Sequence, residues 1–152
     1  MKEGSYKKLS HLPLFMPKSR PQCVLLLQNN EGKVLLQLRD DKPAIPYPNC
    51  WGTFGGQIEE KETSEEAIAR EILEETGYKL TNPEYVGNFP FENYNPYVFR
   101  KVDLNVRLET LKITEGQKGA FLSYSDIQTI KLAFNAKEVL TFYFKKYITP
   151  QR

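Results

Sequence analysis

The acidic segment at residues 58–75 constrains this chain more than any other feature of its sequence. It holds eight glutamates against Lys61 and Arg70, a net charge of −6, whereas the whole chain carries +2, so the other residues together carry +8. This division of charge favours a cation bound at the acidic segment and an anionic ligand attracted by the basic remainder. The alternative interpretation is an acidic helix that only faces solvent.

Residues 63–77 have the features of a helix. Thr63 or Ser64 can cap its start, and Gly77 stands where a left-handed C-terminal cap is expected. At about 100° per residue, four apolar side chains share one arc that we expect to face the core, namely Ile68, Ala69, Ile72 and Leu73. An adjacent arc carries three carboxylates, those of Glu71, Glu74 and Glu75.

Three carboxylates on one helix face repel one another unless a cation lies among them. An all-oxygen, carboxylate-rich set of ligands suits a hard divalent ion such as Mg²⁺ or Mn²⁺. Arg70, on the same helix, can pair with Glu66 or Glu74 one turn away, or reach back to Glu62 and fix the loop before the helix. The sequence therefore predicts a metal site on this helix.

The order of the other elements indicates a mixed sheet covered by helices, an α/β fold. The apolar run at residues 22–28, followed by turn residues, should pair with residues 33–39 as a hairpin. Further strands are expected at residues 51–54, 84–91, 97–108 and 119–123, and further helices at 126–132 and 135–147. We interpret residues 1–21 as a basic N-terminal arm and residues 22–152 as a single domain.

The composition is that of a small globular protein. The longest apolar runs are far below the roughly 20 residues that span a bilayer, and the N-terminal residues lack a signal-peptide core. The two cysteines, Cys23 and Cys50, need no disulfide framework and suit a reducing compartment. We therefore expect a cytoplasmic protein without a membrane segment.

The acidic segment resembles a known family motif. Gly56, Glu62 and the run from Arg70 to Tyr78 (Arg-Glu-Ile-Leu-Glu-Glu-Thr-Gly-Tyr) are similar to the Nudix box of the Nudix hydrolases, with every fixed Gly, Glu and Arg in place. Tyr78 stands where the family prefers an aliphatic residue, and Phe54 stands where many members have proline. The flanking elements resemble the Nudix α/β/α sandwich over about residues 22–148.

The resemblance implies hydrolysis of the diphosphate in a nucleoside diphosphate derivative with the help of Mg²⁺ or Mn²⁺. It implies that the metal is held by Glu71, Glu74, Glu75 and the carbonyl of Gly55, and that Glu62 and Arg70 shape the turn before the helix. Nudix enzymes often place one more glutamate in a later loop, and Glu115 is the candidate here, the alternative being an ordinary turn residue. The general base is left open among Glu74, Glu75 and Glu115.

Residues outside the motif are candidates for substrate binding. Phe91 and Tyr94 can stack on a base, although packing in the core or at a dimer interface is an alternative, and Arg39 can line the phosphate entrance. The spacing of Tyr94 from Gly77 resembles that in dinucleoside polyphosphate hydrolases. Nucleotide sugars and dinucleoside polyphosphates are therefore the first substrate candidates, and nucleoside triphosphates the second.

Two rival functions are retained. One is a non-catalytic Nudix domain that binds a nucleotide as a sensor or interaction module, although degenerate members usually lose glutamates that this chain keeps. The other is RNA cap removal, which the basic surroundings permit, but the sequence shows no dedicated RNA-binding motif and a nucleic-acid partner is not expected. A homodimer is compatible with the sequence.

Overall fold

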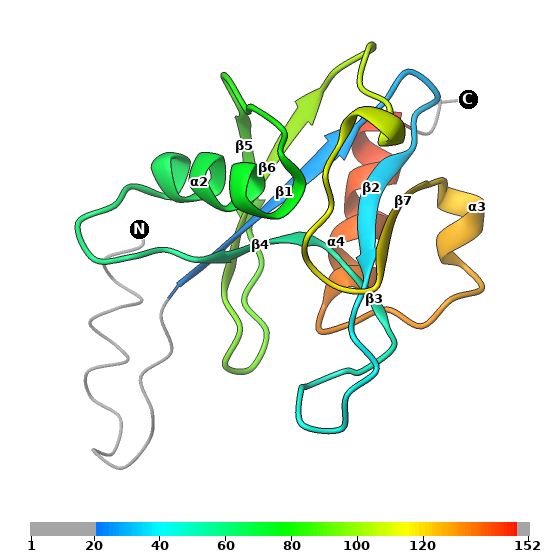
Figure 1. Cartoon of the computed structure of the whole chain (residues 1–152), viewed down its shortest axis with the longest axis horizontal. Coiled ribbons are helices and arrows are strands. Elements are labelled where there is room, and N and C mark those ends of the chain that lie inside the picture. Colours follow the sequence, from blue (N-terminus) through cyan, green and yellow to red (C-terminus); the bar gives the residue numbers. More distant parts are fainter. Residues whose placement is uncertain (1–20, 149–152) are drawn as a thin grey trace.

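The computed structural model describes residues 21–148, so all but the last residue of the predicted arm at residues 1–21, and the last four residues of the chain, lie outside the described residues. Within this range, seven strands form one mixed sheet (Figure 1). Their bounds are β1 Gln22–Gln28, β2 Val34–Leu38, β3 Trp51–Gly52, β4 Phe54–Gln57, β5 Glu84–Asn88, β6 Pro96–Val102 and β7 Lys118–Leu122. The helices are α2 Ser64–Thr76, α3 Tyr124–Ile127 and α4 Ala136–Tyr143, with a 3₁₀ turn at Leu108–Thr110 and a π-helical turn at Phe144–Ile148.

Strand β1 is the centre of the sheet. It pairs in parallel with β6 along its whole length, from Gln22 opposite Pro96 to Gln28 opposite Val102. Its other edge is shared, because its first four residues pair antiparallel with β4 and its last residue pairs with the start of β2. The strands β3 and β7 extend the sheet beyond β2, and β5 extends it beyond β6.

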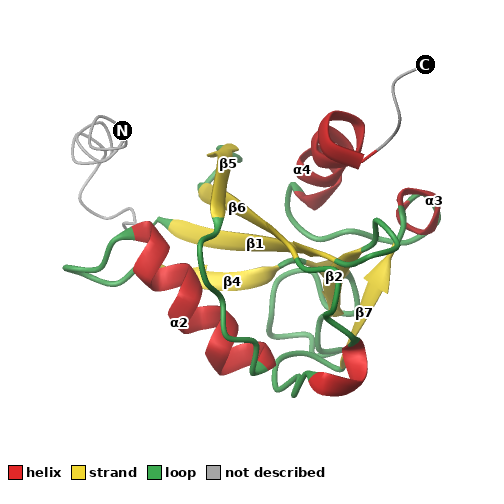
Figure 2. Cartoon of the chain, turned by 90° about the horizontal axis from the view of Figure 1, so that it is seen from above, coloured by secondary structure: helices red, strands yellow, loops and turns green. Residues whose placement is uncertain are grey.

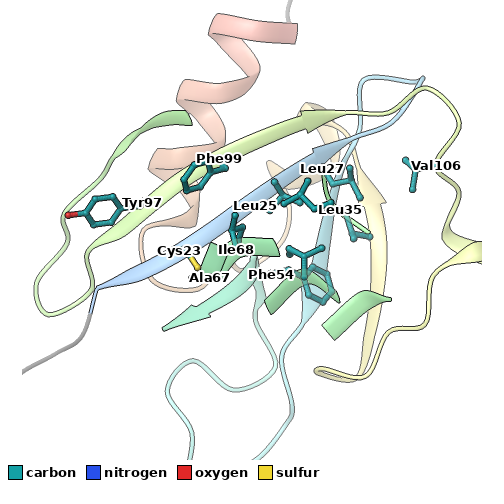
Figure 3. Close-up of a cluster of buried hydrophobic side chains, with 12 residues drawn as sticks. Cys23, Leu25, Leu27, Leu35, Phe54, Ala67, Ile68, Tyr97, Phe99 and Val106 are labelled. Atoms are coloured by element: carbon teal, nitrogen blue, oxygen red, sulfur yellow. The ribbon is translucent and has the colours of Figure 1, made fainter. Parts of the chain in front are cut away.

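Alternate side chains of β1 contribute to two separate cores, one on each face of the sheet. Cys23, Leu25 and Leu27 pack in the core that includes Ile68 and Ile72 of α2 (Figure 3). Val24 and Leu26 point to the opposite face and pack with α4, through Val139, Leu140 and Tyr143 among others. Figure 2 shows α2 on one side of the sheet and α4 on the other. A strand buried on both faces reads as a continuous apolar run, which is how residues 22–28 read.

The expected mixed sheet with helices on both faces is confirmed, with differences at several boundaries. The strand expected at residues 51–54 is two strands, of which β3 pairs with β2 and β4 with β1. The strand expected to reach residue 108 ends at Val102, because the Asp103 side chain accepts hydrogen bonds from the Asn105 amide and the Tyr78 hydroxyl and fixes a turn there. The helix expected at residues 126–132 is the shorter α3.

The hairpin expected between residues 22–28 and 33–39 is confirmed only at its turn, where Gln28 pairs with Val34 and the Asn29 amide donates to the Lys33 carbonyl; the first four residues of β1 pair with β4 on that edge instead. Within the described residues, no helix combines the length and the apolar character needed to cross a membrane. The ends of β4 and α2 that carry the predicted metal site lie on the same side of the central strand β1.

Candidate functional site

Helix α2 begins and ends where the sequence predicts. The Thr63 hydroxyl accepts a bond from the Glu66 amide at 3.0 Å, and the Glu66 carboxylate accepts one from the Thr63 amide at 3.0 Å, so a capping box starts the helix. Gly77 ends it with φ of 74°, and its amide donates to the Leu73 carbonyl. Thr63 rather than Ser64 is the cap. Glu66 is occupied here, so it is not the partner of Arg70.

The buried face of α2 is rotated relative to the prediction. Leu73, expected in the core, is 50% exposed, whereas Glu75 is only 9% exposed and lies beside the buried Ile68 and Ile72. The cause is strand β4, which presents Gly55 and Gly56 to this side of the helix. Residues without side chains leave room for two glutamates to reach the sheet, so the helix turns part of its acidic arc inward.

Two of the predicted metal ligands converge on the glycine pair. The Gly55 amide donates to Glu75 Oε1 at 3.1 Å. A Cβ atom on Gly56 would lie about 2.5 Å from the Glu71 carboxylate oxygens, so only glycine permits this approach. Glu74, on the same predicted arc, has a side chain that is 60% exposed and lies 3.5 Å from Arg70 Nη1.

Arg70 holds the loop before the helix. Its Nε donates to Glu62 Oε2 at 2.6 Å and its Nη2 to Glu62 Oε1 at 3.0 Å, so the pair is bidentate. Nη2 also donates to the Gln57 carbonyl at 3.1 Å. The hydrogen bond from Arg70, with a second from the Glu59 amide, lowers the pKa of Glu62 to about 2. Of the three partners that the sequence left open for Arg70, Glu62 is therefore the principal one. The remaining nitrogen, Nη1, contacts Glu71 at 3.1 Å.

Glu115 approaches the same region from another loop. Burial raises the pKa of Glu75 well above its usual range, and the nearby carboxylates of Glu115 and Glu71 raise it further. The carboxylates of Glu71 and Glu115 are therefore close enough to Glu75 to repel its charged form. Without a cation, this arrangement favours a neutral Glu75.

The donor set fits a hard divalent cation in its chemistry. Glu71, Glu75 and Glu115 supply oxygen atoms, and the charge repulsion at Glu75 is what such a cation would relieve. Within residues 21–148, however, no three acidic, histidine or cysteine side chains are already arranged as around a bound ion. In this structure Glu71 is hydrogen-bonded to Arg70 instead.

A cavity of about 440 Å³ lies against the glycine pair. Its walls include the glycines, Glu115 and all three residues predicted for substrate binding, namely Arg39, Phe91 and Tyr94. The guanidinium of Arg39 donates to the carbonyls of Pro46 and Tyr47, so it also anchors the proline-rich loop. The cavity thus joins residues from three separate loops to the predicted metal site.

Phe134 is the main cavity residue that the sequence analysis missed. Its ring stacks on Tyr94 with centroids 4.6 Å apart and 27° between the planes, and Tyr47 packs against it at the same centroid distance. Arg39 lies over the same ring at 5.3 Å. Phe134 has φ of 53°, a left-handed conformation that is uncommon for a bulky residue and that the surrounding contacts maintain. No signal in the local sequence indicated this position.

A search against protein families matches the model of the NUDIX domain over residues 18–143. The chain belongs to the Nudix family. The match covers the box, the sheet and all of α4, so the resemblance seen in the box extends over the described residues as far as the end of α4.

Known relatives support the family over shorter segments. The nucleoside triphosphatase NudI of Enterobacter sp. (strain 638) is 40% identical over 55 residues, which are 36% of this chain and 38% of that protein. This chain thus spans well under two thirds of that relative's length.

Solved structures show the same fold. The Nudix domain of NrtR from Shewanella oneidensis, complexed with ADP ribose, has a TM-score of 0.71 at 18% identity. The alignment covers 96% of this chain and 99% of the NrtR domain. A bifunctional NMN adenylyltransferase/ADP ribose pyrophosphatase from Francisella tularensis, complexed with AMP and a manganese ion, also has a TM-score of 0.71, at 21% identity. The alignment covers 93% of this chain and 45% of the Francisella protein.

Proposed function

We propose that this Nudix protein is a metal-dependent pyrophosphohydrolase that cleaves the diphosphate of a nucleoside diphosphate derivative. The observation that carries the proposal is the convergence of Glu71 and Glu75 on the Gly55–Gly56 backbone, beside a cavity with aromatic walls. Carboxylates that can hold a divalent cation suit the phosphates of a nucleotide, which bind such a cation, and the aromatic rings suit its base. The 440 Å³ volume lies in the range of small-molecule sites.

In this proposal Glu71, Glu74, Glu75, Glu115 and the Gly55 carbonyl hold Mg²⁺ or Mn²⁺. The metal, when bound, neutralises charge on the phosphate oxygens and lowers the pKa of water. Glu62 and Arg70 keep the turn at Gln57 in place relative to α2. Of the three candidates for the general base, Glu115 alone lines the cavity, whereas Glu75 is bonded to the Gly55 amide, which favours Glu115.

The substrate classes remain those expected from the sequence. Nucleotide sugars and dinucleoside polyphosphates have a nucleoside that fits the aromatic cavity and a diphosphate that reaches the glycine pair. Nucleoside triphosphates are supported by the similarity to a nucleoside triphosphatase, and ADP ribose by its presence in a structural neighbour.

A panel assay tests this proposal. The purified protein is incubated with ADP ribose, UDP-glucose, diadenosine tetraphosphate and dGTP, each with Mg²⁺, with Mn²⁺ and with a chelator. We expect metal-dependent release of a nucleoside monophosphate from at least one of them. Inorganic tripolyphosphate, which has no base, should release no phosphate or pyrophosphate. Nucleotide binding without turnover of any compound would contradict the enzyme and favour a binding module.

Metal binding should also stabilise the protein. Because a cation relieves the repulsion among Glu71, Glu75 and Glu115, Mn²⁺ at a hundredfold excess over its Kd should raise the Tm by roughly 5–10 °C. The measurement is thermal unfolding followed by circular dichroism, against NaCl of equal ionic strength. The shift should persist in Glu59→Gln, whose carboxylate lies outside the motif. An equal shift in a protein carrying both Glu71→Gln and Glu75→Gln would contradict the site.

A further inference from the structure

The loop that carries Glu115 is held by hydrogen bonds at both ends, to the Nudix-box helix α2 on one side and to β2 on the other. Before Glu115, the Thr114 amide donates to the Glu75 carbonyl at 2.9 Å and the Thr114 hydroxyl to the Glu74 carbonyl at 3.0 Å. After Glu115, the Gln117 amide donates to the Leu38 carbonyl at 2.7 Å. Glu115 therefore lies between Thr114, which is bonded to the last turn of α2, and Gln117, which is bonded to the end of β2.

The side chain of Gln117 adds a third connection. Its Nε2 donates to the Arg39 carbonyl at 2.8 Å and to Asn49 Oδ1 at 2.9 Å, so both amide hydrogens are used. Arg39 and Asn49 are the two ends of the proline-rich loop that contains Tyr47, a wall of the cavity. The bond from the Arg39 amide to the Cys50 carbonyl closes the same loop.

Gly116 lies so close to β2 that a side chain would not fit. A Cβ on this residue, which has φ of 75°, would lie 2.6 Å from the Leu38 carbonyl oxygen and 2.7 Å from Gln37 Oε1. The loop therefore lies directly on β2, with little space in which it could shift unless its hydrogen bonds break. The bonds of Gln117 and Thr114 decide where the Glu115 carboxylate stands relative to Glu75 and the cavity.

From these contacts we infer that Gln117 is a positioning residue, which sets the place of Glu115 and ties it to the loop that walls the nucleotide cavity. The inference rests on the proposed function. Gln117 touches neither the predicted metal ligands nor the aromatic rings in the contacts described above, so it acts through Glu115. A displacement of about 1 Å at a catalytic group can cost on the order of a hundredfold in rate.

The test is the isosteric variant Gln117→Met, which removes both side-chain donors, assayed on the four nucleotides of the panel. We expect kcat to fall by about 10- to 100-fold while KM changes by less than about threefold, because the cavity walls remain. Gln128→Met is the matched control, since the Gln128 side chain donates through Nε2 to the Tyr124 carbonyl away from the site, and it should keep the wild-type kcat. A wild-type kcat in Gln117→Met would overturn the inference.

A double-mutant cycle separates positioning from general stability. If Gln117 acts through Glu115, Gln117→Met should cause no further loss of kcat in a Glu115→Gln background, whereas independent effects would multiply and would overturn the inference. If Gln117→Met fails to fold, Asn49→Gly is the alternative test, because it removes one acceptor of the Gln117 side chain. Glycine also suits the backbone φ of 61° at position 49. It should lower kcat severalfold, and a wild-type value would overturn the inference.

Hydrogen exchange distinguishes this inference from the proposed function. In the metal-free protein, amides of residues 114–117 should exchange at least about tenfold faster in Gln117→Met than in the wild type, with α4 unchanged. If the wild type hydrolyses nothing in the panel, the proposed function fails, and the exchange result still stands. Unchanged exchange in residues 114–117 would overturn the positioning role itself.

Discussion

Glu75→Gln is expected to lower kcat by on the order of a thousandfold while leaving the fold intact. The substitution keeps the shape of the side chain and an oxygen that accepts the bond from the Gly55 amide. It removes the negative charge that the proposed metal site requires, and loss of several kcal/mol of charge stabilisation corresponds to about this factor. Single-turnover and steady-state assays on the substrate cleaved in the panel measure the loss.

The stability of Glu75→Gln gives an independent check. The pKa of Glu75 is raised in the folded protein, so the group stabilises the fold below its ordinary pKa, and that contribution is lost as the pH rises through the folded pKa. At neutral pH without metal, a neutral glutamine should therefore give a Tm equal to or above that of the wild type. Glu59→Gln should leave both kcat and Tm nearly unchanged. Equal losses of kcat in the two variants would mean that the acidic segment acts only as a diffuse field.

The parts of this site that could be predicted from sequence are those set by local rules. Gly77 was expected as the C-terminal cap, Thr63 was one of two candidates for the N-terminal cap, and Glu62 was one of three partners open to Arg70 and the one that the family resemblance implied. All three depend on residues within one helix and the loop before it. Strand β1 was recognised at its observed bounds, because burial on both faces requires a continuous apolar run. The roles of the glutamates stay predictions until they are measured.

The rotation of α2 could not be predicted from its own periodicity. Helical spacing gives the angle between side chains but not which arc the sheet will cover. That choice depends on β4, where Gly55 and Gly56 leave room for Glu71 and Glu75 and so turn Leu73 toward solvent. The predicted arc with Leu73 was therefore wrong at one edge, and the contact with another element selected an arc that includes Glu75.

The aromatic cavity depends on contacts even further apart in the chain. Phe134 meets Tyr47 and Tyr94 only because the loops that carry them converge at one end of the sheet. Gln117 likewise reaches Asn49, 68 residues away in the sequence. Pairings of this kind leave no periodic pattern, so the sequence indicated Phe91 and Tyr94 as candidates but neither Phe134 nor Gln117.

Arg70→Lys is expected to lower kcat by about a hundredfold while nucleotide binding stays within a few-fold of the wild type. A lysine can keep one charge contact, but it cannot reproduce the two parallel bonds to Glu62 together with the bonds to the Gln57 carbonyl and Glu71. Without them the turn after β4 is no longer fixed relative to α2, and the distance between Gly55 and Glu75 can change. A misplacement of about 1 Å is enough for a loss of this size.

The pKa of Glu62 reports whether the loss has this cause. In the wild type, the hydrogen bonds of Arg70 lower it from 4.5 to about 2, so their stabilising effect is present above about 4.5 and is lost as the pH falls toward 2. In Arg70→Lys the pKa should rise toward 4.5, which an NMR titration of labelled glutamates measures.

The matched control for Arg70→Lys is Glu66→Ala, which removes the reciprocal bond of the capping box without touching Arg70. It should lower the Tm modestly and leave kcat near the wild-type value, the reverse of the pattern expected for Arg70→Lys. Because both residues belong to α2, this contrast separates the stability of the helix from the geometry of its acidic face. Wild-type turnover in Arg70→Lys, with the pKa of Glu62 raised as expected, would show that the Arg70–Glu62 pair serves the fold and not the reaction.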